Sequence, residues 1–176
     1  MRLRDLYVAL VLTGVLVATP LRAGELRSVT ERTLDAPRAD VWALLTTKAG
    51  LQRWLSRDVT LDFRVGGRVE TEEVRPRMEG KLTRMVLAYD PERLIAVRPL
   101  LIPGTVSDRN VWESSWLVIT LESAGEKKTL LRVVGLVPTG FPASEGVLND
   151  LQESNRRMLE KLAAAAAAKP AGSSTP

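Results

Sequence analysis

The sequence predicts a two-layer α+β domain in which an antiparallel sheet packs against one long C-terminal helix. Apolar and polar residues alternate over several short stretches that are joined by turn sequences. A single long amphipathic segment follows the last of these stretches. The chain has 176 residues, of which 45% are hydrophobic and 26% are charged, and this composition is typical of one globular domain.

The first 23 residues have the order of a secretory signal peptide. A short basic start is followed by an uncharged run over 6–18, and then by a proline and the small residue Ala23. As a helix this run would rise only about 20 Å, less than the roughly 30 Å hydrocarbon core of a bilayer. We therefore predict cleavage after Ala23, with cleavage after Ala18 and an uncleaved membrane anchor as alternatives. The mature domain would then be periplasmic in a bacterium, or secreted.

Histidine and cysteine are both absent from the sequence. Their absence excludes disulfide bonds, thiolate or imidazole metal ligands, and catalytic pairs of histidine with serine or cysteine. Without the leader the chain would carry 22 basic and 20 acidic residues, and the basic ones are scattered singly. Such an even balance does not favour nucleic acid as a partner. We expect no metal site and no cofactor.

The N-terminal half is predicted to hold strands interrupted by two short helices. Pro37 marks the first turn of a helix, and a second helical turn is predicted over 51–55. Two adjacent glycines indicate a tight turn between the second and third strands. The strands of this half are expected over 26–34, 59–65 and 68–74.

The C-terminal half is predicted to complete the sheet and then to form the long helix. Further strands are expected over 80–89, 94–99, 115–121 and 129–137, with a loop over 100–111. The helix is expected over 145–168, with Ser144 as its N-cap and an apolar stripe that must be buried against the sheet. We assign residues 24–168 to the domain and expect a disordered tail over 169–176.

Five short segments resemble the START-related domains of the SRPBCC superfamily. Residues 36–42 read APRADVW, which resembles the opening of these domains, and residues 51–55 read LQRWL, which resembles the tryptophan turn that follows. Residues 63–69 (FRVGGRV), 78–82 (MEGKL) and 89–94 (YDPERL) are similar to strand motifs of the branch named after the heat-shock-protein-90 ATPase activator homologue. These segments occur in the order typical of that branch and extend over most of the chain.

The resemblance implies a helix-grip fold, in which a curved antiparallel sheet of about six to seven strands wraps around the C-terminal helix. It also implies an apolar cavity between the sheet and the helix. Members of the superfamily bind lipids, sterols, polyketides and other hydrophobic compounds, and a minority are enzymes. The chain departs from the branch by carrying a leader, and because that chaperone is not exported we expect no chaperone partner. We also expect no stable membrane span once the leader is cleaved.

The candidate ligand-binding residues are side chains that such a fold would turn toward the cavity. The apolar ones are Phe63, Met78, Met85, Tyr89, Trp112, Leu151 and Met158. Ordinary core packing is the alternative for each of them. Glu79, at a strand start, and Arg98, among apolar strand residues, complete the set. An inward arginine without a protein partner would anchor a ligand carboxylate, but alternation also allows Arg84, Arg98 and Arg132 to lie on the solvent face.

The leading hypothesis is an exported domain that binds or carries a small hydrophobic molecule (a lipid, polyketide or aromatic compound) without catalysing a reaction. One alternative is an envelope enzyme of the cyclase, dehydratase or hydrolase type that uses a carboxylate, for which Glu79 is the best candidate. The other alternative is a protein-interaction domain whose cavity has collapsed into core. An interior without a pocket of roughly 300 Å³ would favour this last hypothesis.

Overall fold

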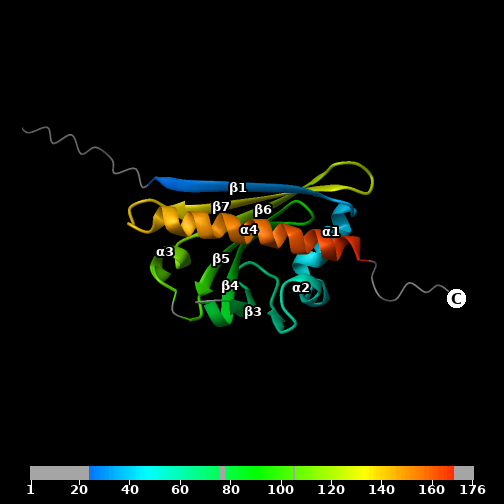
Figure 1. Ribbon diagram of the computed structural model, residues 1–176. Coiled ribbons are helices and arrows are strands. Elements are labelled where there is room, and N and C mark those ends of the chain that lie inside the picture. The colour runs from blue at the N-terminus through cyan, green and yellow to red at the C-terminus, as the bar shows by residue number, and fades with distance from the viewer. Residues whose placement is uncertain (1–23, 76–77, 105, 169–176) are drawn as a thin grey trace, which may run out of the picture.

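A single antiparallel sheet and one long helix organise the described part of the chain. The computed structural model describes residues 24–75, 78–104 and 106–168, which form seven strands and four helices. The strands lie in the order β1-β7-β6-β5-β4-β3-β2, so the first strand pairs with the last. Figure 1 shows the helix α4 running along β1 and β7. The predicted α+β class, antiparallel sheet and long C-terminal helix are confirmed.

The elements follow the predicted order, with one short helix added. The first half contains β1 (Glu25–Leu34), α1 (Arg38–Thr46), α2 (Lys48–Trp54), β2 (Val59–Leu61) and β3 (Arg68–Arg75). The second half contains β4 (Met78–Asp90), β5 (Leu94–Leu101), α3 (Arg109–Glu113), β6 (Trp116–Ser123), β7 (Thr129–Pro138) and α4 (Ser144–Ala167). The added helix is α3, which overlaps the end of the predicted loop and extends two residues beyond it.

The helix α4 buries one stripe of side chains against the sheet. Leu159 and Leu162 are almost fully buried and pack with Leu34 of β1 and Leu131 of β7. Burying a leucine side chain stabilises a fold by roughly 1.5–3 kcal/mol. This packing fixes α4 over the β1–β7 half of the sheet.

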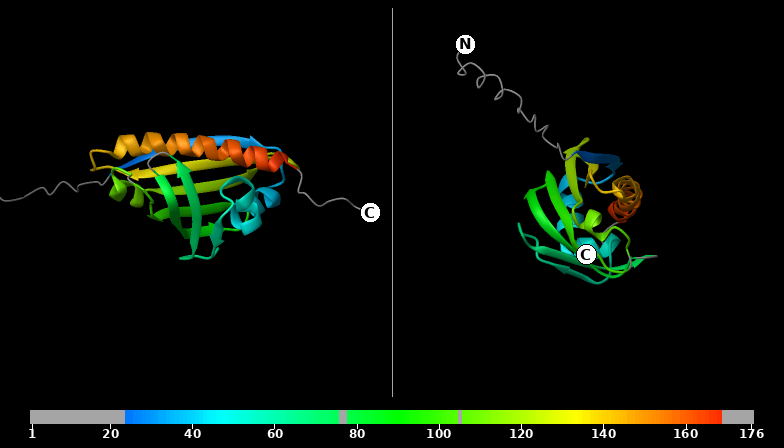
Figure 2. Two further views of the ribbon diagram at one scale, coloured as in Figure 1. Left: turned by 60° about the horizontal axis from the view of Figure 1, so that its bottom comes forward. Right: turned by 90° about the vertical axis from the view of Figure 1, so that its left-hand side faces the viewer.

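The other half of the sheet curves away from α4, as Figure 2 shows. The pairing of β4 with β5 shifts register between Thr83 and Arg84 and again between Val86 and Ala88. Such irregularities bend a strand and increase its twist. The helices α1 and α2 lie beside the C-terminal end of α4, and α3 lies near its N-terminal end (Figure 1).

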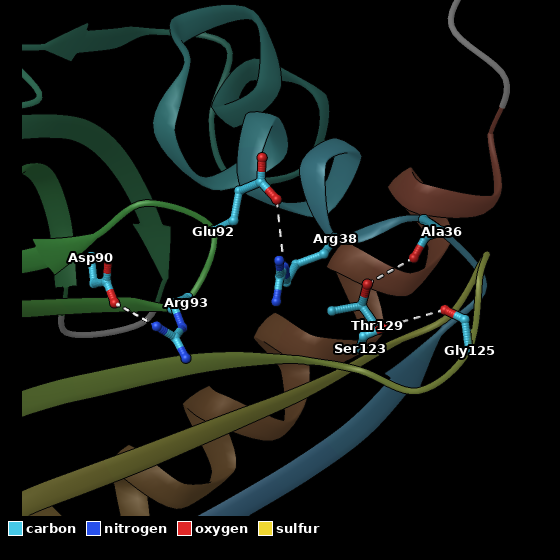
Figure 3. Close-up of polar contacts among 8 residues, drawn as sticks. All are labelled: Ala36, Arg38, Asp90, Glu92, Arg93, Ser123, Gly125 and Thr129. Atoms are coloured by element: carbon cyan, nitrogen blue, oxygen red, sulfur yellow. Dashed lines mark hydrogen bonds and ion pairs between the residues drawn. The ribbon is translucent and has the colours of Figure 1, made fainter.

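Polar contacts hold the start of α1 against the sheet (Figure 3). The buried Thr129 hydroxyl donates a hydrogen bond to the carbonyl of Ala36 at 2.8 Å, and Arg38 Nε lies 3.4 Å from Glu92 Oε2. The ion pair is partly exposed and therefore contributes little to stability, whereas the hydroxyl would be costly to leave unpaired. The first contact thus ties the entry of α1 to β7.

Two local predictions are wrong. β2 ends at Leu61, so the expected strand over 59–65 is cut short and Val65 is 61% exposed. Ser144 is the first residue of α4 and Ala143 is its N-cap. The Ser144 hydroxyl donates to the carbonyl of Pro138 at 2.7 Å instead of accepting a bond from the helix.

Two further predictions concern the ends of the chain. The expected leader over 1–23 and the expected tail over 169–176 lie outside the described residues. None of the helices in the described ranges combines the length and the hydrophobicity that crossing a membrane requires.

Candidate functional site

A cavity of about 700 Å³ lies between α4 and the half of the sheet that curves away from it. Its wall is formed by β3, β4, β5 and β6, by α1, α2 and α3, and by one side of α4. Most of the lining side chains are apolar; Leu51, Val86, Ile102 and Leu117 are examples. The volume lies within the range of small-molecule sites, so the interior has not collapsed into solid core.

Strand alternation decides which side chains of β5 reach the cavity. Ile95, Val97 and Pro99 line the wall. Successive side chains of a strand point to opposite faces, so Arg98 lies on the outer face, where it is exposed. Arg98 is therefore not a residue of the cavity wall, contrary to the prediction.

Four predicted site residues lie in the cavity wall, namely Phe63, Trp112, Leu151 and Met158. They come from three parts of the chain: the segment after β2, the helix α3, and the helix α4, which contributes the last two. Tyr89 was also predicted to line the cavity but does not. Its ring centroid lies 5.0 Å from that of Phe63, and 39% of its surface is exposed, so it packs on Phe63 while remaining open to solvent.

The predictions for β4 are wrong where the side chain can be placed. Leu82, Arg84 and Val86 of this strand line the cavity. Glu79 and Met85 occupy the alternate positions of the strand, and neither lines the cavity. Glu79 is exposed. The side chain of Met78 lies outside the described part of the chain. Apolar residues occur on both faces of this strand, so the sequence pattern did not identify the inner one.

A buried ion pair is present beside the apolar lining. Arg84 Nη2 lies 3.3 Å from Glu73 Oε1, with the two side chains 19% and 6% exposed. Arg84 Nη1 also donates to the Thr71 hydroxyl at 3.0 Å. The register pairs Arg84 with Val69, and both side chains line the cavity. Of the two orientations left open for Arg84, the inward one is observed, and Glu73 was missed as its partner.

Arg132 takes the outward orientation. Its guanidinium pairs with Glu31 of β1 and lies 3.6 Å from Glu122 of β6. The hydrogen bond to Glu31 and the attraction of that carboxylate raise the pKa of Arg132 above its ordinary value. Arg132 therefore links three neighbouring strands on the outer face and takes no part in the cavity.

Asn155 of α4 is a polar residue in the cavity wall that the sequence analysis missed. It is 2% exposed, and its Nδ2 atom has no hydrogen-bond partner among the described residues. A signal was present in the sequence, because Asn155 lies one helical turn from both Leu151 and Leu159 and thus interrupts the apolar stripe.

Charged side chains of α4 lie along one edge of the cavity. Asp150, Arg157 and Lys161 line it and are otherwise exposed. Arg157 Nη1 lies 3.0 Å from Glu153 Oε1. A hydrogen bond from Arg156, together with the charges of both arginines, holds the pKa of Glu153 below its ordinary value, although burial acts in the opposite direction. This edge is a solvated rim that contrasts with the apolar interior.

The family of the chain follows from its sequence. Residues 35–167 match the model of the family described as "Activator of Hsp90 ATPase homolog 1-like protein". This chain belongs to that family. The AHSA1-like domain is part of the SRPBCC superfamily, so the resemblance found in the short motifs is confirmed at this level. A search of the curated proteins finds no match.

Solved structures of low identity share the fold. The protein MLL2253 from Mesorhizobium loti is 22% identical with a TM-score of 0.61, over 80% of this chain and 96% of that one. The Aha1 dimer from Colwellia psychrerythraea is 16% identical with a TM-score of 0.61, over 82% and 99%. Norcoclaurine synthase from Thalictrum flavum, in complex with dopamine and hydroxybenzaldehyde, is 14% identical with a TM-score of 0.60, over 80% and 86%. These likenesses confirm the helix-grip fold.

Proposed function

We propose that this AHSA1-like domain binds a small hydrophobic molecule in the cavity and carries it without changing it chemically. The observation that supports the proposal is the cavity itself, with about 700 Å³ of space and a mostly apolar wall. A ligand that buries about 200 Å² of apolar surface there gains about 5 kcal/mol, before the cost of association is subtracted. The apolar wall supplies affinity, and the few polar groups in it orient the ligand.

Aromatic and lipid-like molecules fit this proposal best. Phe63, Trp54 and Trp112 bring aromatic rings to the wall, and Met158 adds a flexible thioether that adapts to different shapes. Norcoclaurine synthase, which has the same fold, is solved with two small aromatic compounds. The fold therefore accommodates molecules of this class.

A carboxylate-based enzyme has less support. Such a mechanism needs an acidic group in contact with the ligand, in an apolar setting that tunes its pKa. Glu79 lies outside the cavity, and Glu73 is already bonded to Arg84. Among the described residues, Asp150 is the acidic side chain that lines the cavity, and it is exposed at the rim. Carriage without catalysis is therefore the function we propose.

Native mass spectrometry of the protein purified from its own host tests this function. We expect the wild type to retain a small-molecule adduct that denaturation releases. Leu117→Trp places an indole in the cavity and should abolish the adduct, because Leu117 lines the wall. Val65→Trp is the matched control, since Val65 is 61% exposed and lies away from the cavity. It should retain the adduct.

The folded state of each variant is checked by thermal unfolding. Leu117→Trp should unfold near the wild-type temperature, because the larger side chain enters empty space. Val133→Trp should unfold at a much lower temperature, because Val133 is completely buried and does not line the cavity. A wild type that carries no adduct and also fails to bind added fluorene, an aromatic hydrocarbon, would overturn the proposal.

A further inference from the structure

The amide of Asn155 lies at a buried position of α4 where an apolar side chain would pack well. Its neighbours one helical turn away, Leu151 and Leu159, are both buried, and Asn155 itself is 2% exposed. Leucine is also the better helix former of the two residue types. Helix propensity and core packing therefore both favour leucine at this position, and neither accounts for the asparagine.

The Nδ2 group of Asn155 also lacks a hydrogen-bond partner in the described part of the chain. An amide donor that is removed from water and left unpaired destabilises the folded state. Nearly all buried polar groups in native proteins have partners, so an unpaired one requires a specific explanation. A partner that enters the cavity is one such explanation, because Asn155 forms part of the cavity wall.

We propose that the cavity selects apolar molecules that carry a neutral hydrogen-bond acceptor, such as a ketone or ester carbonyl, and that Asn155 binds this oxygen. The inference rests on the proposed function and deepens it by naming the ligand class. The terminal torsion of an asparagine side chain is soft, so rotation about it can turn Nδ2 toward a bound molecule. Met158, the flexible residue beside it in the wall, can move to admit the oxygen.

The surroundings of Asn155 favour a neutral acceptor over an anion. The lining residues Leu151, Ser154 and Met158, all within about one helical turn of Asn155, carry no charge. Arg157, two positions along the helix, also lines the cavity, but it is exposed at the rim and pairs with Glu153. Arg84, the buried cation of the wall, already faces the carboxylate of Glu73. A buried anion would need a counter-charge of its own, whereas a carbonyl oxygen needs one or two donors, which an amide group supplies.

Two matched pairs of probes test the inference. Each pair consists of a ketone and a hydrocarbon of the same shape: 9-fluorenone with fluorene, and benzophenone with diphenylmethane. The quantity measured is the ratio of ketone affinity to hydrocarbon affinity in the wild type and in Asn155→Leu. Comparing the ratio between proteins removes the effect of the different water solubilities. We expect the ratio to fall about fivefold or more in the variant for at least one pair, the usual effect of losing one hydrogen bond.

Asn149→Leu is the control, because Asn149 is exposed on the same helix and does not line the cavity. It should leave both ratios unchanged. Thermal unfolding of the ligand-free proteins separates binding from structure. Asn155→Leu should be at least as stable as the wild type if the amide serves a ligand, and less stable if it holds a buried water that bridges it to the fold.

The outcomes distinguish this inference from the proposed function. A wild type that binds none of the four probes counts against the cavity function as a whole. A wild type that binds the probes, with ratios that Asn155→Leu leaves unchanged for both pairs, overturns the role of Asn155 and leaves the carrier function standing. Loss of stability in Asn155→Leu with unchanged ratios identifies the asparagine as a structural residue and also overturns the inference.

Discussion

Glu73 and Arg84 illustrate how a fold keeps two charged side chains beside an apolar cavity. They lie on the neighbouring strands β3 and β4, and the Thr71 hydroxyl accepts a hydrogen bond from the guanidinium of Arg84. Taking such a pair out of water costs free energy that their attraction offsets only while both partners are present. Removing either member alone would therefore destabilise the fold, because the other charge would be left buried without a partner.

Replacing Glu73 by glutamine should expose this dependence. We expect Glu73→Gln to lower the free energy of unfolding by about 3 kcal/mol, because Arg84 is left buried with weaker compensation. Glu70→Gln is the control on the same strand, where Glu70 Oε2 lies 3.4 Å from the exposed Lys81. It should lower the free energy of unfolding by less than about 1 kcal/mol. Urea denaturation measures both values, and equal losses would contradict the description of the buried pair.

At the residue scale, the sequence located the apolar side of the site better than the polar side. Phe63, Leu151 and Met158 were found because the resemblance supplied the fold and the helical stripe supplied the orientation. Glu79 and Arg98 were misplaced because both faces of β4 and β5 carry apolar residues, so alternation alone does not reveal which face is concave. That choice depends on the curvature of the whole sheet.

At the element scale, the strands and the long helix were predictable because their signals are strong and repeated. Turn sequences separate the strands, and the stripe of α4 recurs over six turns or so of helix. The five-residue helix α3 was missed because it is too short to show helical periodicity. The early end of β2 was missed because alternation continues in the sequence after the pairing with β3 has stopped.

The packing of α2 against α1 depends on one glycine. A Cβ atom at Gly50 would lie 2.1 Å from the carbonyl oxygen of Ala43 and 2.6 Å from the Cα atom of Leu44. Both are backbone atoms, so the two helices must separate to accept a larger residue. Because α2 contributes Leu51 and Trp54 to the cavity wall, this separation would also alter the site.

Two alanine substitutions should therefore have opposite effects. Gly50→Ala should lower the free energy of unfolding by about 2 kcal/mol, the typical cost of overpacking. Gly146→Ala, in α4, should raise it by roughly 0.5–1 kcal/mol, because nothing lies within 4 Å of the added Cβ atom and alanine is the better helix former. Chemical denaturation of the two variants checks both signs, and a neutral Gly50→Ala would show that the helices are less closely packed than described.

At the scale of the whole molecule, the cavity results from how α4 and the strands of the sheet are placed relative to one another. The helix α4 packs on β1 and β7, while β3, β4 and β5 bend away from it (Figure 2). The space between them remains because the side chains of the wall are too few to fill it. Its existence was inferred from the family resemblance, since composition and periodicity carry no information about internal volume.

A prediction for the whole molecule concerns the leader. We propose that residues 1–23 direct export and are removed after Ala23, so the mature protein begins at Gly24. N-terminal sequencing of the protein from the periplasmic or secreted fraction of its host checks this, and a start at Thr19 would place the cleavage at the alternative site after Ala18. Recovery of a chain that begins at Met1 in the cytosolic fraction would contradict export.

A crystal structure of the protein grown with saturating 9-fluorenone would show whether the cavity encloses a ligand. We expect electron density for one molecule inside the domain, between α4 and the curved strands, in contact with Phe63, Leu117 and Met158. The ketone oxygen should lie within hydrogen-bond distance of Asn155 Nδ2. Density confined to the outer surface, or an interior that side chains fill completely, would contradict the claim that this fold is built to enclose a ligand.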